Sequence, residues 1–271
     1  MKIDRAAEYA GFLLMCWGGT LGVHSLLSLP PPQILSLHPY INYLTPHVFL
    51  STLFSQAFPS PSLLKFIDTV LPMVDAILRT GGITSSIHLA LTHPTHPQLR
   101  SSLFLQLLLG AVASAGGGVL AGTLNVFSAH WSFTTPPFLR SNTPSGSFLG
   151  TLDIWSGSVV SLIYGFLIGS HPSYAPIQRF LISNAPFLFG NIDKDSWSAP
   201  LLQGSAVQLM TPLEARSVSV IVLTLIYAYR VYAVHYRAPS SAKMDARRIW
   251  KNVKSQQGTP VKADASKEKT A

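Results

Sequence analysis

The stretch SSLFLQLLLGAVASAGGGVLAGTLNVF, residues 101–127, decides the fold class of this chain. It contains no Asp, Glu, Lys or Arg. It is also longer than the roughly 20 apolar residues that a helix needs to cross a hydrocarbon core about 30 Å thick. The stretch therefore predicts a transmembrane helix.

The composition of the whole chain supports the same class. Of its 271 residues, 48% are hydrophobic and 11% are charged, whereas a soluble domain usually has about 25% charged residues. The formal net charge is +8, and the Lys and Arg residues are concentrated from Arg237 onward. A basic run beside a hydrophobic helix typically marks the cytosolic side or contacts anionic lipid headgroups. We therefore expect membrane lipid, and no nucleic acid, as a partner.

Five further segments are apolar enough to be read as helices, although the second and third carry several polar or charged residues. They cover residues 9–29, 40–58, 63–79, 147–169 and 213–236. The sequence thus predicts an all-α integral membrane protein with about six transmembrane helices. Six spans place both ends of the chain on one side, which the basic tail identifies as the cytosol.

The remaining segments are predicted to be less regular. Residues 80–100 form a polar hinge in this interpretation, and residues 170–211 are irregular. The transmembrane domain then covers residues 1–236, and residues 237–271 form a basic cytosolic tail that is largely disordered, with a short helix near residues 244–254.

Glycines are concentrated in two of the predicted helices. The pieces CWGGTLGVHSL (residues 16–26) and SAGGGVLAGTL (residues 114–124) look like corresponding parts of an internal repeat. A glycine inside a helix costs about 1 kcal/mol relative to alanine, so such clusters need a physical reason. One reason is close packing of helices through small faces. The other is a kinked or broken helix in each half, which exposes backbone carbonyls to a water-filled ion path.

The chain resembles the trimeric intracellular cation channels of the endoplasmic and sarcoplasmic reticulum over residues 9–236. The most specific part is GAVASAGGGVLAGTLNVFSAHW (residues 110–131), which is similar to the glycine-kinked helix of that family. Supporting parts are VLP at residues 70–72, the segment with His88, His93 and His96, and a last helix that begins after Pro212.

This resemblance implies a homotrimer that conducts potassium as counter-ion flow during calcium release. It further implies an ion path along the two glycine-rich helices, with Thr20, Ser114 and Thr123 offering hydroxyl oxygens. The implied pore or hinge residues are Gly18, Gly19, Thr20, Gly22, Ser114, Gly116, Gly117, Gly118 and Thr123. Lys65 and Arg79 would contact lipid phosphate, as in a bound phosphoinositide.

The chain departs from the family pattern in three places. The family usually has seven spans, and this chain begins at the second. The family's Lys-Glu-Val signature falls near Asp75, Ala76 and Ile77, and the lysine that precedes the glycines in animal members is replaced around Ala113 and Ser114. These departures leave open an alternative, a non-conducting membrane scaffold or lipid-binding protein with the same fold.

Other patterns give weaker indications. Lys267 and Lys269 lie five and three places from the end of the chain, which resembles a dilysine signal for retrieval to the endoplasmic reticulum. We interpret the three histidines as solvated hinge residues rather than a metal site, since Pro94 and Pro97 interrupt the helix that would orient them.

Asp153 lies near the start of a predicted span and is either a functional residue inside the membrane or an interfacial one. The sequence has no GxSxG, GxGxxG or P-loop pattern, so we do not expect an enzyme. No cofactor is expected apart from the lipid.

Overall fold

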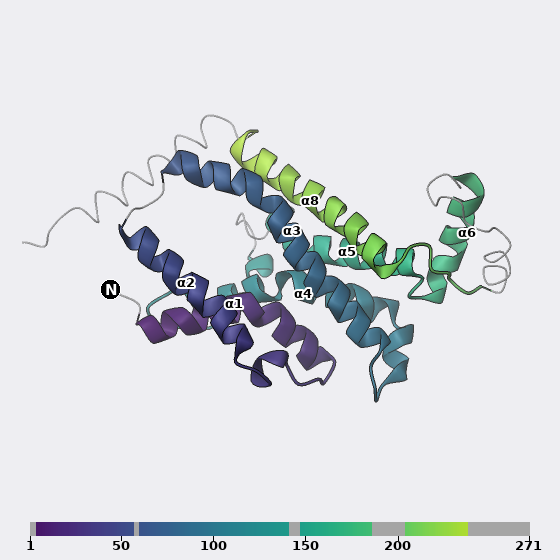
Figure 1. The fold of residues 1–271 in the computed structure, drawn as a ribbon, viewed down its shortest axis with the longest axis horizontal. Helices are drawn as coiled ribbons and strands as arrows, with labels where there is room; N and C mark the ends of the chain where they lie inside the picture. The colour runs from purple at the N-terminus through teal and green to yellow at the C-terminus, as the bar shows by residue number, and fades with distance from the viewer. Residues whose placement is uncertain (1–3, 57–59, 141–146, 186–203, 238–271) are drawn as a thin grey trace, which may run out of the picture. The chain divides into compact units, whose positions relative to one another are not determined.

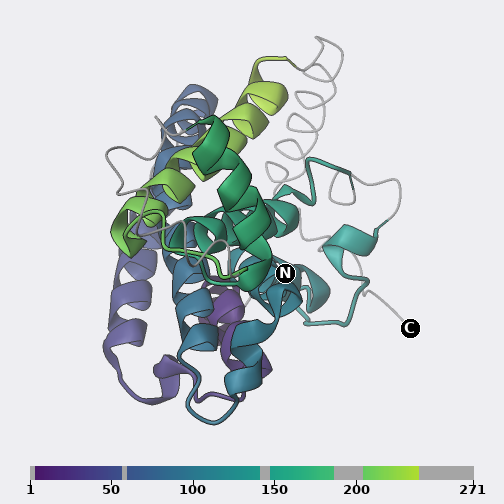
Figure 2. The ribbon, with the colours of Figure 1, turned by 90° about the vertical axis from the view of Figure 1, so that its right-hand side faces the viewer.

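The computed structural model describes residues 4–56, 60–140, 147–185 and 204–237, and within these ranges every regular element is a helix. The elements are shown in Figures 1 and 2. In chain order they are α1 (Arg5–Leu26), η1 (Pro32–Ile34), α2 (His38–Gln56), α3 (Pro61–Leu91), η2 (Pro97–Ser101), α4 (Leu103–Thr123), η3 (Pro137–Leu139), α5 (Leu152–Ile168), η5 (Pro172–Tyr174), α6 (Ala175–Asn184) and α8 (Pro212–His235).

The chain divides into two compact units, residues 1–229 and residues 230–271. The first unit contains α1 to α6 and α8 as far as residue 229. The predicted helix near residues 244–254 and the two lysines of the retrieval signal, Lys267 and Lys269, lie outside the described residues.

Short-range chemistry sets several helix boundaries. The Ser102 hydroxyl accepts a hydrogen bond from the Leu105 amide at 3.1 Å and caps the start of α4. At the start of α8, the Thr211 amide donates to the Glu214 carboxylate at 2.9 Å, and the Glu214 amide donates back to the Thr211 hydroxyl at 3.4 Å. This pair is a capping box. Gly169 ends α5 with a left-handed backbone (φ 66°), a conformation that glycine adopts without steric cost.

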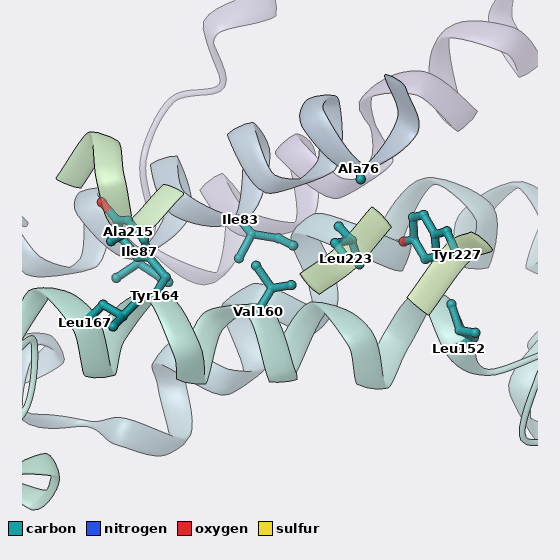
Figure 3. Packing of buried hydrophobic residues seen from close by; sticks show 10 residues of the cluster. All are labelled: Ala76, Ile83, Ile87, Leu152, Val160, Tyr164, Leu167, Ala215, Leu223 and Tyr227. Carbon is teal, nitrogen blue, oxygen red and sulfur yellow. The ribbon is translucent and has the colours of Figure 1, made fainter. Parts of the chain in front are cut away.

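The main hydrophobic core lies where α3, α5 and α8 meet. Ile83 of α3, Val160 of α5 and Leu223 of α8 are fully buried and point toward one another (Figure 3). The helices α3 and α8 lie side by side in both ribbon views (Figures 1 and 2). Helix α4 contacts α1, α3 and α5, so it links these three helices.

The prediction of a polar hinge at residues 80–100 is wrong for its first half. Helix α3 continues without interruption from Pro61 to Leu91. Thr80, Ile83, Thr84 and Ile87 are buried at helical spacing, so this part of α3 packs into the core like any amphipathic helix. The Thr84 hydroxyl donates to the Thr80 carbonyl at 2.9 Å, which satisfies the polar group inside the helix.

The prediction of an irregular chain over residues 170–211 is wrong for residues 172–184, which form η5 and α6. Helix α6 follows α5 at an angle of 85°.

By length and hydropathy, two of the described helices, α4 and α8, can cross a membrane. Helix α5 and the helical segment Pro172–Asn184 meet the same criteria only when they are taken together. They would be a third spanning segment if the bent pair is one span. These helices are consistent with a membrane protein. Six spans remain a prediction. The structure describes α1 and α4 each as one continuous helix, so kinks at their glycines also remain a prediction.

Candidate functional site

The glycines of α1 and α4 face each other across a close helix contact, which we call the α1–α4 seam. A methyl group at Gly18 would lie 2.7 Å from the Cα of Gly117, and one at Gly116 would lie 2.8 Å from the Cα of Gly19. A methyl group at Gly117 would overlap the carbonyl oxygen of Met15. The glycines therefore allow the two backbones to touch, as small residues do in membrane helix pairs.

The contacts across this seam are reciprocal. Aligning the two repeated pieces matches Gly18 with Gly116 and Gly19 with Gly117. In the structure Gly18 lies against Gly117, which is the counterpart of Gly19. Gly19 in turn lies close to Gly116, which is the counterpart of Gly18. This exchange is the pattern that a pseudo-two-fold axis between α1 and α4 produces. It agrees with the internal repeat and with the close-packing explanation of the glycines.

The other predicted pore residues point in different directions around α1 and α4. Gly22 faces the side chain of Val112 across the same two helices. Gly118 faces open space, since a methyl group there would meet no atom within 4 Å. The Thr123 hydroxyl donates to the Val119 carbonyl at 2.6 Å, and Thr20 is half-buried. The predicted pore set therefore does not converge on one place.

A second close contact, which the sequence analysis missed, joins α4 to α5. A methyl group at Gly110 would lie 2.5 Å from the carbonyl oxygen of Gly157, and one at Gly157 would lie 2.6 Å from the Cβ of Ser114. The Ser161 hydroxyl donates to the Gln106 carbonyl at 2.6 Å across this contact. Its signal is present in the sequence, because a small residue recurs at every fourth position from Gly110 and again from Gly157.

The four helices α3, α4, α5 and α8 meet around one guanidinium group, which we call the Arg79 centre. Arg79 Nε lies 2.9 Å from Asp75 Oδ1 one turn earlier in α3, and Arg79 Nη1 lies 3.2 Å from Asp153 Oδ1 of α5. Nη1 also donates to the carbonyl oxygen of Ser114 in α4 at 2.7 Å. The guanidinium carbon lies 5.3 Å from the centre of the Tyr227 ring of α8, within cation–π range.

The Arg79 centre carries an excess of negative charge. Two carboxylates and one guanidinium leave one formal negative charge among the three side chains. The side chains of Arg79, Asp75 and Asp153 are 26%, 37% and 32% exposed, so water and small ions can reach them. A second arginine, Arg216 of α8, lies against Gly81 of α3 and interacts with Tyr164, outside this set of contacts.

Neutral oxygens surround the charged groups. The hydroxyl oxygens of Ser114 and Ser156 are buried. Both border the Tyr227 phenol. Carboxylate, carbonyl and hydroxyl oxygens are the groups that replace water around an alkali cation. The Arg79 centre therefore combines excess negative charge with several oxygen atoms that can act as cation ligands.

The sequence analysis named some of these residues but did not bring them together. Asp153, left open between two roles, is the partner of Arg79. Ser114, assigned to the glycine helix, contributes its carbonyl to the same place. Lys65, which was grouped with Arg79, lies 14 residues earlier in α3, or about 21 Å along the helix, and is exposed. The structure does not place Lys65 and Arg79 in one site.

In the part of the chain that the structure describes, His88, His93 and His96 are not part of any group of three or more His, Cys, Asp or Glu side chains placed to hold a metal ion. The expectation that all three are solvated is wrong for His93. This residue is buried, and its Nε2 lies 2.8 Å from the carbonyl oxygen of Leu27. His88 lies on the exposed side of α3, and His96 is exposed beside His93, with ring centres 5.3 Å apart.

An open groove of about 450 Å³ is lined by Met15 of α1, by Gly118 and Gly122 of α4 and by Arg140, among others. Arg140 donates to the Gly122 carbonyl at 2.9 Å and thereby caps the end of α4.

Comparison with known proteins adds no assignment. No protein-family model matches this chain, and neither a curated protein nor a solved structure matches it.

Proposed function

We propose that the protein conducts monovalent cations, chiefly potassium, across an intracellular membrane. The observation that supports this function is the Arg79 centre, where two carboxylates and one guanidinium lie among helices of an apolar domain. Charged side chains are costly within a membrane and commonly mark ion pathways there. The net negative charge of the cluster favours a cation over an anion.

A cation passing this centre would exchange part of its hydration shell for protein oxygens. Asp75 and Asp153 supply charge, and the hydroxyls of Ser114 and Ser156 supply neutral ligands. The positive charge of Arg79 repels a bound cation and so weakens its binding. Weak binding suits conduction, which requires that the ion can also leave the site. The close contact of α1 with α4 at the α1–α4 seam then holds α4 in position beside the ion path.

The remaining parts of the proposal rest on the sequence. They are the trimer, the six spans with glycine kinks, the endoplasmic reticulum membrane, the cytosolic C-terminus and the counter-ion role during calcium release. Binding of a phosphoinositide at Arg79 is less favoured than the ion path, because Asp75 and Asp153 already surround the guanidinium and repel a phosphate.

Replacement of one carboxylate tests the ion path. Asp153→Asn removes a charge without changing the size of the side chain. A unit charge 4 Å from an ion is worth about 1 kcal/mol in water and about 4 kcal/mol at an effective dielectric of 20. Cation occupancy, and with it the potassium current at low salt, should therefore fall about five-fold or more. Single-channel recording of the purified protein in a planar bilayer under a potassium chloride gradient measures both the current and the reversal potential.

Asp68→Asn is the matched control, because Asp68 is an exposed carboxylate on α3, the helix of Arg79, and lies 11 residues before Arg79. It should leave the current unchanged. Wild-type current and reversal potential in Asp153→Asn would overturn the ion path through the Arg79 centre.

A non-conducting scaffold is the second candidate function. The observation that favours it is the α1–α4 seam, since the two glycine-rich helices touch at the backbone where the resemblance implies a water-filled path. Assembled trimers that leave the bilayer silent would support the scaffold. Potassium-selective current from the same preparation would exclude it.

A further inference from the structure

The segment between α5 and α8 begins with a right-angle bend. Helix α5 has 17 residues, about 26 Å of helix, which is close to the roughly 30 Å thickness of the hydrocarbon core. Helix α6 then follows at 85° (Figure 1). If α5 runs across the membrane, a helix set at a right angle to its end runs parallel to the membrane surface.

The side chains of α6 fall into three sectors when they are placed at about 100° per residue. Gln178 is buried against the rest of the protein. Ile177 and Phe180 form an apolar sector and are 55% and 65% exposed. Arg179 and Ser183 are exposed and form a polar sector on the opposite flank. A helix that lies in a membrane interface beside a protein has these three neighbours: protein, lipid and water.

One polar residue lies within the apolar sector, and the helix itself satisfies it. The side-chain amide of Asn184 donates to the carbonyl oxygen of Phe180 at 2.7 Å. The apolar sector therefore does not bring an unpaired amide donor to the lipid.

A buried glutamine holds α6 in this orientation. Gln178 Nε2 donates to the carbonyl oxygens of Phe166, at 2.8 Å, and Val207, at 2.9 Å. The Val207 amide donates back to Gln178 Oε1 at 2.9 Å. Gln178 thus links the end of α5 to the chain that leads into α8. Because Gln178 is buried and its bonds are made to the backbone, they fix which side of α6 faces the protein.

After α6 the chain comes back to the C-terminal end of α5 before α8 begins. The amides of Leu209 and Met210 donate to the carbonyl oxygen of Leu167 at 2.9 Å and 3.1 Å. Residues just before α8 therefore lie beside the last turn of α5. Both ends of the segment between α5 and α8 are at the same end of α5, so the segment makes no net crossing of the membrane.

We infer that α6 is an amphipathic helix lying in the membrane interface, with Ile177 and Phe180 inserted at the boundary between lipid headgroups and acyl chains. The partner of this surface is the phospholipid bilayer. The inference uses the membrane location of α5 and does not depend on conduction. It also assigns residues 172 and 205 to the same side of the membrane, with α5 and α8 as consecutive spans of opposite direction.

Site-directed spin labelling in vesicles of phosphatidylcholine and phosphatidylglycerol tests this inference. Cys16 is the single cysteine of the chain, so Cys16→Ser provides a cysteine-free background in the full-length protein. Phe180→Cys and Ile177→Cys place labels in the apolar sector, and Ser183→Cys is the matched control on the same helix. Labels at 177 and 180 should collide more with oxygen than with a water-soluble nickel chelate, at about 5–10 Å depth. The label at 183 should show the reverse.

Three results would overturn the inference. Labels at 177 and 180 that favour the nickel chelate would place α6 in water. Labels shielded from both reagents would place a protein, such as a second copy of this chain, on the apolar sector. Labels near the bilayer centre would mean that α6 crosses.

Thiol labelling of sealed vesicles gives a second measurement on exposed residues that the fold does not need. Ser173→Cys and Ser205→Cys should react with a membrane-impermeant maleimide from the same side. Reaction of these two cysteines from opposite sides would overturn the same-side assignment.

Discussion

Two adjacent glycines of α4 should respond in opposite ways to the same substitution. A methyl group at Gly117 would overlap the carbonyl oxygen of Met15, whereas one at Gly118 would meet no atom within 4 Å. Both changes to alanine gain up to about 1 kcal/mol of helix propensity. Only Gly117→Ala must also separate α1 from α4, because the atom in its way is backbone and no side-chain rotation can relieve the overlap.

The cost of this separation sets the expected difference. Overpacking of a close contact typically costs about 1–3 kcal/mol, and a backbone clash belongs at the upper end. Gly117→Ala should therefore lower the free energy of unfolding by about 2 kcal/mol after the gain in propensity. Gly118→Ala should raise it by up to about 1 kcal/mol. Reversible unfolding of the purified variants in mixed micelles, followed by circular dichroism, measures both values.

The comparison also separates the two explanations of the glycine clusters. If Gly117 faced a water-filled path rather than α1, the methyl group would have room, and the two variants would unfold alike. Equal stability within about 0.5 kcal/mol would therefore refute the α1–α4 seam and favour the kinked-helix explanation. A large difference with the expected signs would support close packing.

Two further predictions concern the charges and the start of α8. In a double-mutant cycle of Arg79→Gln and Asp153→Asn, the two changes should couple by about 0.5–3 kcal/mol in unfolding free energy, since each removes the partner of the other. Independent effects would mean that the ion pair does not form in the folded protein. Thr211→Ala should destabilise by about 1 kcal/mol through loss of the cap, and Glu214→Gln by less, because an amide oxygen still accepts from the Thr211 amide. Equal losses would instead assign the effect to the charge of Glu214 at the helix start.

Much of the helical architecture could be predicted from the sequence. Each predicted apolar segment overlaps one described helix, because long apolar runs bounded by proline, serine or glycine mark helices through local forces. The main failures arise because local sequence patterns do not show which residues tertiary packing will bury. Thr80 and Thr84 look like loop residues in the sequence, but inside α3 both are buried, and the Thr84 hydroxyl donates to the Thr80 carbonyl. The packing of α3 against α5 and α8 keeps the helix intact.

The sequence by itself determined the class of the protein, since the lack of charge over residues 101–127 and the glycine clusters can be read without coordinates. Only the tertiary structure decided which small residues touch and which charges meet. Asp153 and Arg79 are 74 positions apart in the chain, and no local pattern links them. They meet because the small faces of α4 and α5 let the two helices approach closely while α3 crosses both, and such long-range geometry is set by packing rather than by spacing.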